Sequence, residues 1–252
     1  MSGNYYSSGA AGDAFAIACW EAWTPGVAAA SDWRAWLDGT LTPQADAKPD
    51  VSYLPAMLRR RLDALGRMAL ATAWPCVDNL DSFEYVFGSR HGSLSRTLEL
   101  LVALIDGEPL SPSLFSLAVH NNVAGLFSIA RGNRSAATAI AADEDTLAMT
   151  LLEAAGMIAA GAPQVLVTYA EDVAPEIYRP LVPPPRSHPF AVSLLLAPPA
   201  GATAQYALVE SGAMISEEPE AALIRLLIGD APEAEIGVNQ PWRLERRHDV
   251  AA

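Results

Sequence analysis

Residues 111–167 decide the fold, and they read SPSLFSLAVHNNVAGLFSIARGNRSAATAIAADEDTLAMTLLEAAGMIAAGAPQVLV. The first part, 112–131, is apolar almost all round, which predicts a helix buried on every side. A strand of small residues at 137–142, a sharp turn, a helix at about 145–160 and a strand from Val165 to Tyr169 follow. A strand, a turn, a helix and a second strand form the repeating unit of a parallel sheet covered by helices.

The rest of the chain continues this alternation. Apolar periodicity predicts helices at 54–73 and 94–105, and a last helix that opens at Ser216. Strands are expected at 14–20, 83–87, 190–196 and 206–209. The segment beyond Gly229 is polar, and we expect it to be loosely held. The pattern indicates an α/β protein with a mostly parallel sheet covered on both faces.

Composition excludes several function classes. Charged residues make up only 18% of the 252 residues, which indicates an unusually apolar surface used for association. The net charge of −13 would repel nucleic acid. No apolar run reaches membrane-spanning length and the N-terminus does not look like a signal peptide, so we expect a cytoplasmic protein. Cys19 and Cys76 match no metal or redox spacing, and we expect neither metal nor cofactor.

Familiar catalytic motifs are missing from the sequence. It contains no nucleotide-binding glycine pattern, no HExxH and no GxSxG. The turn from Gly88 to Gly92 is read as a strand-to-helix connection, with His91 exposed, rather than as an anion cradle. His120, inside the predicted buried helix, is expected to have a hydrogen-bond partner.

A resemblance to a known family rests on small residues at fixed spacing. Ser111-Pro112, Asn121, Ala124-Gly125, Ser128-Ile129 and Gly132, followed by the small-residue strand, the turn and the helix, resemble β-ketoacyl synthases. Arg60, Arg61 and Met68 fit the same family more loosely. The resemblance covers about residues 10–210 and implies the N-terminal half of a thiolase-like fold with a buried central helix. Residues 211–252 would then be a C-terminal helix and a loosely ordered tail.

The same resemblance implies that the chain has lost its nucleophile. In the family a cysteine stands at the turn between the strand and the buried helix, where the helix N-terminus lowers its pKa. An ungapped register from Ser111-Pro112 to Gly161 places that cysteine at Glu144, and residues 140–146 contain no cysteine. The two histidines of the family's C-terminal half are also missing, because only His188 and His248 lie late in the chain. Autonomous condensation is therefore not expected.

Glu144 has two interpretations. The acidic run 143–145 can simply be a helix start that caps free N–H groups. Alternatively, Glu144 is a carboxylate in an emptied nucleophile site, since chain-length-factor subunits of the family carry a polar residue there.

The resemblance implies a partner rather than an enzyme. We expect a chain-length-factor-like subunit in a heterodimer with a full-length β-ketoacyl synthase, serving acyl-carrier-protein-dependent fatty acid or aryl-polyene biosynthesis. Acyl carrier protein would contact the pair through the ketosynthase, because two acidic proteins repel. A self-associating structural module and a minor acyl-thioester enzyme using Glu144 stay open as alternatives. At the interface we expect the edge strand with Thr138, then Leu114 or Phe115 in the partner's acyl tunnel, and Asn121.

Overall fold

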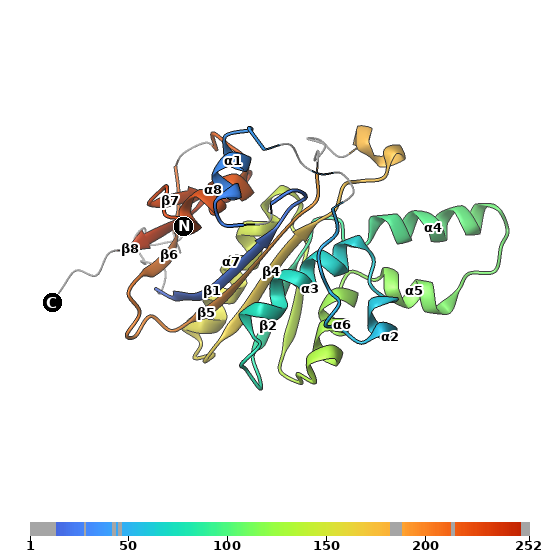
Figure 1. The fold of residues 1–252 in the computed structure, drawn as a ribbon, viewed down its shortest axis with the longest axis horizontal. Helices are drawn as coiled ribbons and strands as arrows, with labels where there is room; N and C mark the ends of the chain where they lie inside the picture. The colour runs from blue at the N-terminus through green and yellow to red at the C-terminus, as the bar shows by residue number, and fades with distance from the viewer. Residues whose placement is uncertain are drawn as a thin grey trace, which may run out of the picture.

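The computed structural model describes residues 14–27, 29–41, 44, 47–181, 188–212 and 215–247. Two sheets form the framework (Figure 1). The larger has the order β1-β5-β4-β2-β3, with β1 (Ala16–Trp23), β2 (Glu84–Gly88), β3 (Ala137–Ile140), β4 (Val165–Glu171) and β5 (Phe190–Ala197). β5 is antiparallel to both of its neighbours, whereas β2 is parallel to β3 and β4. Four strands therefore run in one direction, which confirms the mostly parallel sheet.

Both faces of this sheet are covered by apolar side chains. β4 and β5 are almost continuously hydrophobic, as expected of strands buried on two sides. Val165, Val167 and Tyr169 pack with α7 (Thr146–Ala159) on one face. Leu166 and Ala170, at the alternate positions, pack with α3 (Ala64–Cys76) and α6 (Asn122–Arg131) on the other. The buried helix expected after the small-residue strand is α7.

The predicted helix at 54–73 is two helices. α2 (Ala56–Arg59) is short, and α3 begins after Asp63, whose Oδ1 accepts a hydrogen bond from the Gly66 amide at 2.9 Å. An aspartate that caps a helix in this way favours a new helix start over continuation of the old one. α4 (Leu94–Ile105) has the predicted bounds.

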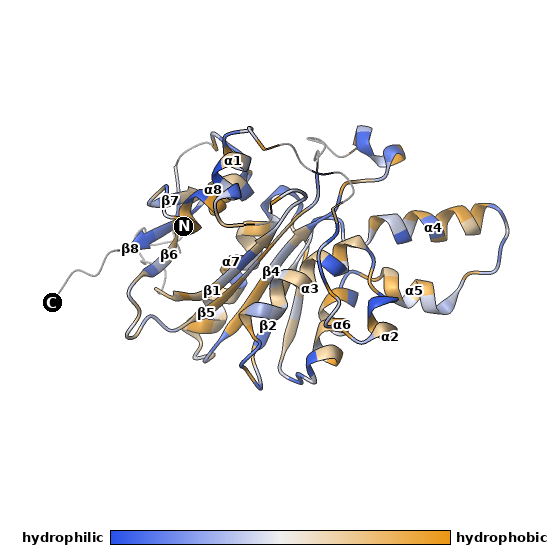
Figure 2. Cartoon of the chain, viewed as in Figure 1, coloured by the Kyte–Doolittle hydropathy of each residue, from blue (hydrophilic) through white to orange (hydrophobic). Residues whose placement is uncertain are grey.

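The prediction of one fully buried helix at 112–131 is wrong. α5 (Pro112–Ala118) has no buried residue, and α6 follows it at an angle of 97°. α4 and α5, with the loop between them, extend together away from the sheet as a hairpin of residues 94–118, called the α4–α5 hairpin below (Figure 1). Figure 2 shows hydrophobic residues along both helices. Uniform apolarity in this segment therefore reflects an exposed apolar surface as well as burial. Within the described residues no single helix has the length and apolarity to cross a membrane, and α5 with α6 qualify only as a bent pair.

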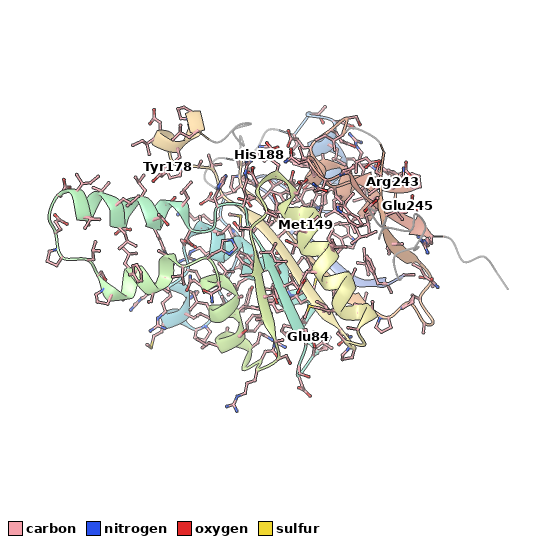
Figure 3. The ribbon with its side chains drawn as sticks, turned by 180° about the vertical axis from the view of Figure 1, so that it is seen from behind. Glu84, Met149, Tyr178, His188, Arg243 and Glu245 are labelled. Carbon is pink, nitrogen blue, oxygen red and sulfur yellow. The ribbon has the colours of Figure 1, made fainter. Side chains whose placement is uncertain are left out.

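The described residues beyond Gly229 include two strands, where the sequence predicted a loosely held tail. β6 (Gln205–Glu210), β7 (Glu233–Glu235) and β8 (Trp242–Arg247) form an antiparallel sheet of order β6-β8-β7. A bridge between Phe15 and Tyr206 connects it to the rest of the protein. Figure 3 shows Arg243 and Glu245 on β8, far from the α4–α5 hairpin.

The remaining elements are short. α1 (Asp32–Leu37) and α8 (Pro219–Leu227) contact each other beside the second sheet. The last helix starts at Pro219 rather than Ser216, because proline fits the first turn, where its missing N–H is not needed. The other two elements are short 3-10 helices, η1 (Asp143–Asp145) and η2 (Glu176–Leu181).

Candidate functional site at the β3–α7 turn

The turn between β3 and α7 is sharp and acidic. Asp143 has a φ of +52°, and it is the only non-glycine residue with positive φ in the part of the chain that the structure describes. Aspartate tolerates this left-handed region better than most residues, but it remains a strained position of the kind found at functional sites. The Thr146 hydroxyl holds the turn closed, since it donates to the Asp143 carbonyl at 2.7 Å and accepts from the Ala142 amide at 3.0 Å.

Arg90 faces this turn from the end of the neighbouring strand β2. Its Nη2 lies 2.5 Å from Asp143 Oδ1 and 4.0 Å from Glu144 Oε1. The backbone N–H of Arg90 donates to the carboxylate of Glu171, at the end of β4. Residues from the carboxyl ends of three neighbouring strands therefore meet at Arg90: Asp143 and Glu144 face its guanidinium, and Glu171 accepts from its backbone N–H. The Glu144 carboxylate thus lies near the positive charge of Arg90 and is not an isolated acidic group.

Asp145 closes the turn from the other side. Its Oδ1 accepts hydrogen bonds from the backbone nitrogens of Val238 at 2.7 Å, Asn239 at 2.9 Å and Gln240 at 3.2 Å. The Asn239 side-chain amide also lies 3.4 Å from Glu144 Oε2. A backbone loop between β7 and β8 thus covers Asp145, the residue just before α7. Sequence reasoning missed this contact, because nothing local links residues 93 positions apart.

Glycine makes the covering loop possible. A Cβ atom on Gly237 would collide with the carbonyl oxygen of Gln240. The tight turn at 237–240 therefore requires a residue without a side chain at this position. The closed loop then aims three successive N–H groups at one carboxylate, an arrangement that suits a buried anion. Asp145 is only 6% exposed, so its carboxylate serves the structure of the turn.

No thiol lies at this turn. Cys19 on β1 and Cys76 at the end of α3 lie beside each other, with their sulfur atoms 2.9 Å apart. Both belong to the sheet face covered by α3, whereas the first residues of α7 pack on the opposite face. Within the described ranges, no three His, Cys, Asp or Glu side chains are arranged so that they could hold a metal ion.

The histidines are held by other contacts. His120 Nε2 lies 2.7 Å from the Ser89 carbonyl, which confirms the expected hydrogen bond. His188 Nε2 accepts from Trp36 Nε1 at 3.3 Å, and His248 falls outside the described residues. His91 is partly buried rather than exposed as predicted, and it lines a cavity of about 80 Å³ together with Asp63 and Asp172.

The four residues expected at a partner interface fall on two surfaces. Thr138 lies in β3, an edge of the large sheet, where its side chain is partly buried. Phe115 on α5 is 61% exposed and Leu114 is partly buried. Asn121 is exposed in the bend between α5 and α6.

The α4–α5 hairpin carries a concentration of exposed apolar side chains, as the low charge content predicted. Its most exposed large residues are Ile105 at 82%, Phe115 at 61% and Leu104 at 60%. Arg96 anchors the hairpin, because its buried guanidinium donates to the carbonyls of Leu117 at 2.8 Å and Arg61 at 2.5 Å. An apolar surface on an anchored element is typical of a protein–protein contact.

Comparison with known proteins identifies the family. The model of the β-ketoacyl synthase N-terminal domain matches residues 33–229, more than half of the chain. The chain belongs to the β-ketoacyl synthase family. No curated protein sequence matches it.

Solved ketosynthase structures share the fold. One is described as a ketosynthase (ApeO) in complex with its chain length factor (ApeC) from Xenorhabdus doucetiae. It matches at 26% identity and a TM-score of 0.77, over 92% of this chain and 99% of the matched one. The ishigamide ketosynthase/chain length factor matches at 17% identity and a TM-score of 0.62, over 87% and 74%. A β-ketoacyl synthase from Burkholderia phymatum matches at 14% identity and a TM-score of 0.61, over 87% and 71%. This β-ketoacyl synthase-family chain thus has the thiolase-like α/β fold.

Proposed function

We propose that this chain is a non-catalytic, chain-length-factor-like subunit that pairs with an active, full-length β-ketoacyl synthase. One observation carries the proposal: the β3–α7 turn, where the family resemblance implies a nucleophilic cysteine, holds Asp143, Glu144 and Asp145, and Arg90 lies beside the first two. A carboxylate has no sulfur, so it cannot form the thioester acyl-enzyme that condensation requires.

The nearly complete overlap with a chain from a ketosynthase–chain length factor complex supports the pairing. That chain is covered over 99% of its length, so it has no additional half-domain that this chain lacks. Because 26% identity is distant, we extend to this chain only the kind of assembly, a heterodimer of two ketosynthase-like subunits.

Two surfaces suit the partner. β3 pairs on one side with β2 and leaves its other edge unpaired among the described residues, and such edges recruit a second strand. The α4–α5 hairpin presents apolar side chains beyond that sheet. Phe115, 61% exposed in the isolated chain, suits a position in the partner's acyl tunnel better than a place in this chain's own core.

The pathway is inferred from chemistry and family. A subunit of charge −13 is a poor surface for an acidic acyl carrier protein, so the carrier would dock on the ketosynthase. We place the pair in acyl-carrier-protein-dependent fatty acid or aryl-polyene synthesis in the cytoplasm.

Co-expression with a full-length, cysteine-containing β-ketoacyl synthase from the same organism tests the proposal. Size-exclusion chromatography with light scattering should give a 1:1 complex, and condensation should need both chains. A stable homodimer that ignores the ketosynthase would support a self-associating module instead. Turnover of an acyl or malonyl thioester by this chain alone, abolished by Glu144→Gln, would support an enzyme.

A further inference from the structure

Cys19 and Cys76 come together although they are 57 residues apart and on different elements. Their sulfur atoms lie 2.9 Å apart, and Cys76 also lies 3.9 Å from the Ser193 carbonyl on β5. Cys76 is 5% exposed, whereas Cys19 is partly exposed at the edge strand β1. They are the only two cysteines of the chain.

A bulge in β1 turns Cys19 toward its partner. The register with β5 shifts between Ile17, which faces Leu196, and Cys19, which faces Leu195. In a regular strand, residues two apart share a face. Here Ile17 packs on the α7 face and Cys19 on the α3 face. Bulges commonly re-aim a side chain, and this one puts a thiol against the end of α3.

We propose that Cys19 and Cys76 form a redox-reactive dithiol that closes to an intramolecular disulfide by exchange with a small-molecule disulfide. The site is independent of the proposed pairing function, because it lies on the α3 face, away from β3 and the α4–α5 hairpin.

The two thiols have different parts in the exchange. The Cys19 thiolate attacks one sulfur of the small-molecule disulfide and releases one thiol, which leaves a mixed disulfide on Cys19. Cys76 then attacks the Cys19 sulfur, its proton passes to the departing thiolate, and a second thiol is released. Two protein thiols are oxidised and one external disulfide is reduced. Burial and the hydrogen bond with Cys19 raise the pKa of the Cys76 thiol, which makes it a poor first attacker.

Binding of a metal ion is a weaker explanation than thiol exchange for the closeness of Cys19 and Cys76. Structural zinc sites use four ligands. Two thiols are present here, and no third His, Cys, Asp or Glu joins them in an arrangement suited to a metal among the described residues.

The test uses the folded full chain incubated with oxidised glutathione, then denatured with N-ethylmaleimide and measured by intact mass and peptide mapping. We expect the loss of two hydrogen atoms, no maleimide addition and one cross-linked peptide pair containing Cys19 and Cys76. The oxidised protein should melt about 5 °C or more above the reduced one, since the cross-link closes a long loop.

Single variants separate the steps. Cys76→Ser should stop at a stable glutathione adduct on Cys19, and Cys19→Ser should leave Cys76 unmodified until denaturation. Wild-type protein with both cysteines alkylated, with a lasting glutathione adduct, or with cross-links only between molecules would overturn the proposal. Peptide mapping of the wild type decides the question even if a variant fails to fold.

Discussion

Asp145 Oδ1 lies 2.7 Å from the backbone nitrogen of Val238, so the residue just before α7 is tied to a loop 93 residues further along the chain. Two further amides, those of Asn239 and Gln240, point at the same carboxylate. The β3–α7 turn is therefore supported by a loop of the chain's own C-terminal sheet. This contact makes the covering loop part of the fold rather than an appendage.

Removing the Asp145 carboxylate should destabilise the protein. Asp145→Ala leaves three loop amides without their acceptor, and we expect a loss of about 2–3 kcal/mol in the free energy of unfolding. Chemical denaturation measures the loss, and amide hydrogen exchange at 238–240 should become faster. The control is Asp143→Asn, which keeps a residue tolerant of positive φ and removes an ion pair whose carboxylate is 70% exposed. It should cost about 0–1 kcal/mol. Unchanged exchange in Asp145→Ala would refute the structural role of this contact.

A lysine at Thr138 should disrupt pairing with the ketosynthase. Thr138 lies in the edge strand β3, and a charged amine placed in a strand-to-strand interface would lose its hydration. We expect Thr138→Lys to weaken the complex at least about tenfold, or to make the protein insoluble. Ala18→Lys is the matched control, because Ala18 is exposed on β1 at the opposite edge of the sheet. Equal binding by both variants, measured by surface plasmon resonance, would exclude β3 from the interface.

Shortening Phe115 should lengthen the product of the paired enzyme. A bulky apolar side chain that closes the acyl tunnel limits how many methylenes of the growing acyl chain fit inside it. Each methylene left outside forfeits about 0.8 kcal/mol of burial free energy. Because Phe115 is 61% exposed, Phe115→Ala should change the stability of the isolated chain by only about 0.5 kcal/mol. Leu114→Ala should act similarly, with a larger stability cost because Leu114 is partly buried.

Leu181→Ala is the control for that experiment, since Leu181 is 74% exposed in η2, outside the α4–α5 hairpin. Mass spectrometry of the products gives the chain lengths, and thermal melting gives the stability. Variants that melt lower and make wild-type products would show that Leu114 and Phe115 serve only this chain's own packing.

Asp172 should make stability depend on pH. Burial raises the pKa of its carboxyl, the Val173 N–H lowers it, and the negative charge of Asp63 raises it further. The folded state thus favours the protonated carboxyl. The free energy of unfolding is therefore unaffected below the ordinary aspartate pKa of about 4, and it falls as pH rises from there through the raised pKa. Asp172→Asn should melt higher than wild type at neutral pH, and the difference should vanish in acid. Asp81→Asn, at an exposed position, should match wild type throughout, and equal behaviour of the two variants would rule out the effect.

The sequence was most informative where its periodicity is regular, whether or not the element is buried. The largely exposed helix α4 has the predicted bounds, and the strands of the large sheet lie within a few residues of their predicted positions. It was least informative at 112–131, where apolarity was equated with burial. An apolar residue on α5 and one on α3 look alike in sequence, and only the presence of a covering partner distinguishes them.

The candidate site could be predicted only in its local part. The acidic turn follows directly from residues 143–145, whereas its contacts with Arg90 and Val238 join distant segments. The Cys19–Cys76 contact was missed for the same reason, since it depends on a bulge that the spacing of the two residues does not reveal.

Mass spectrometry of the co-expressed pair after exposure to an acyl-thioester tests the non-catalytic role most directly, with the intact complex weighed first and its separated subunits second. We predict a 1:1 complex in which the acyl group is found on the ketosynthase and this chain keeps its unmodified mass. An acyl adduct on residues 140–146 of this chain, or a chain that never joins the ketosynthase, would contradict the role proposed for it.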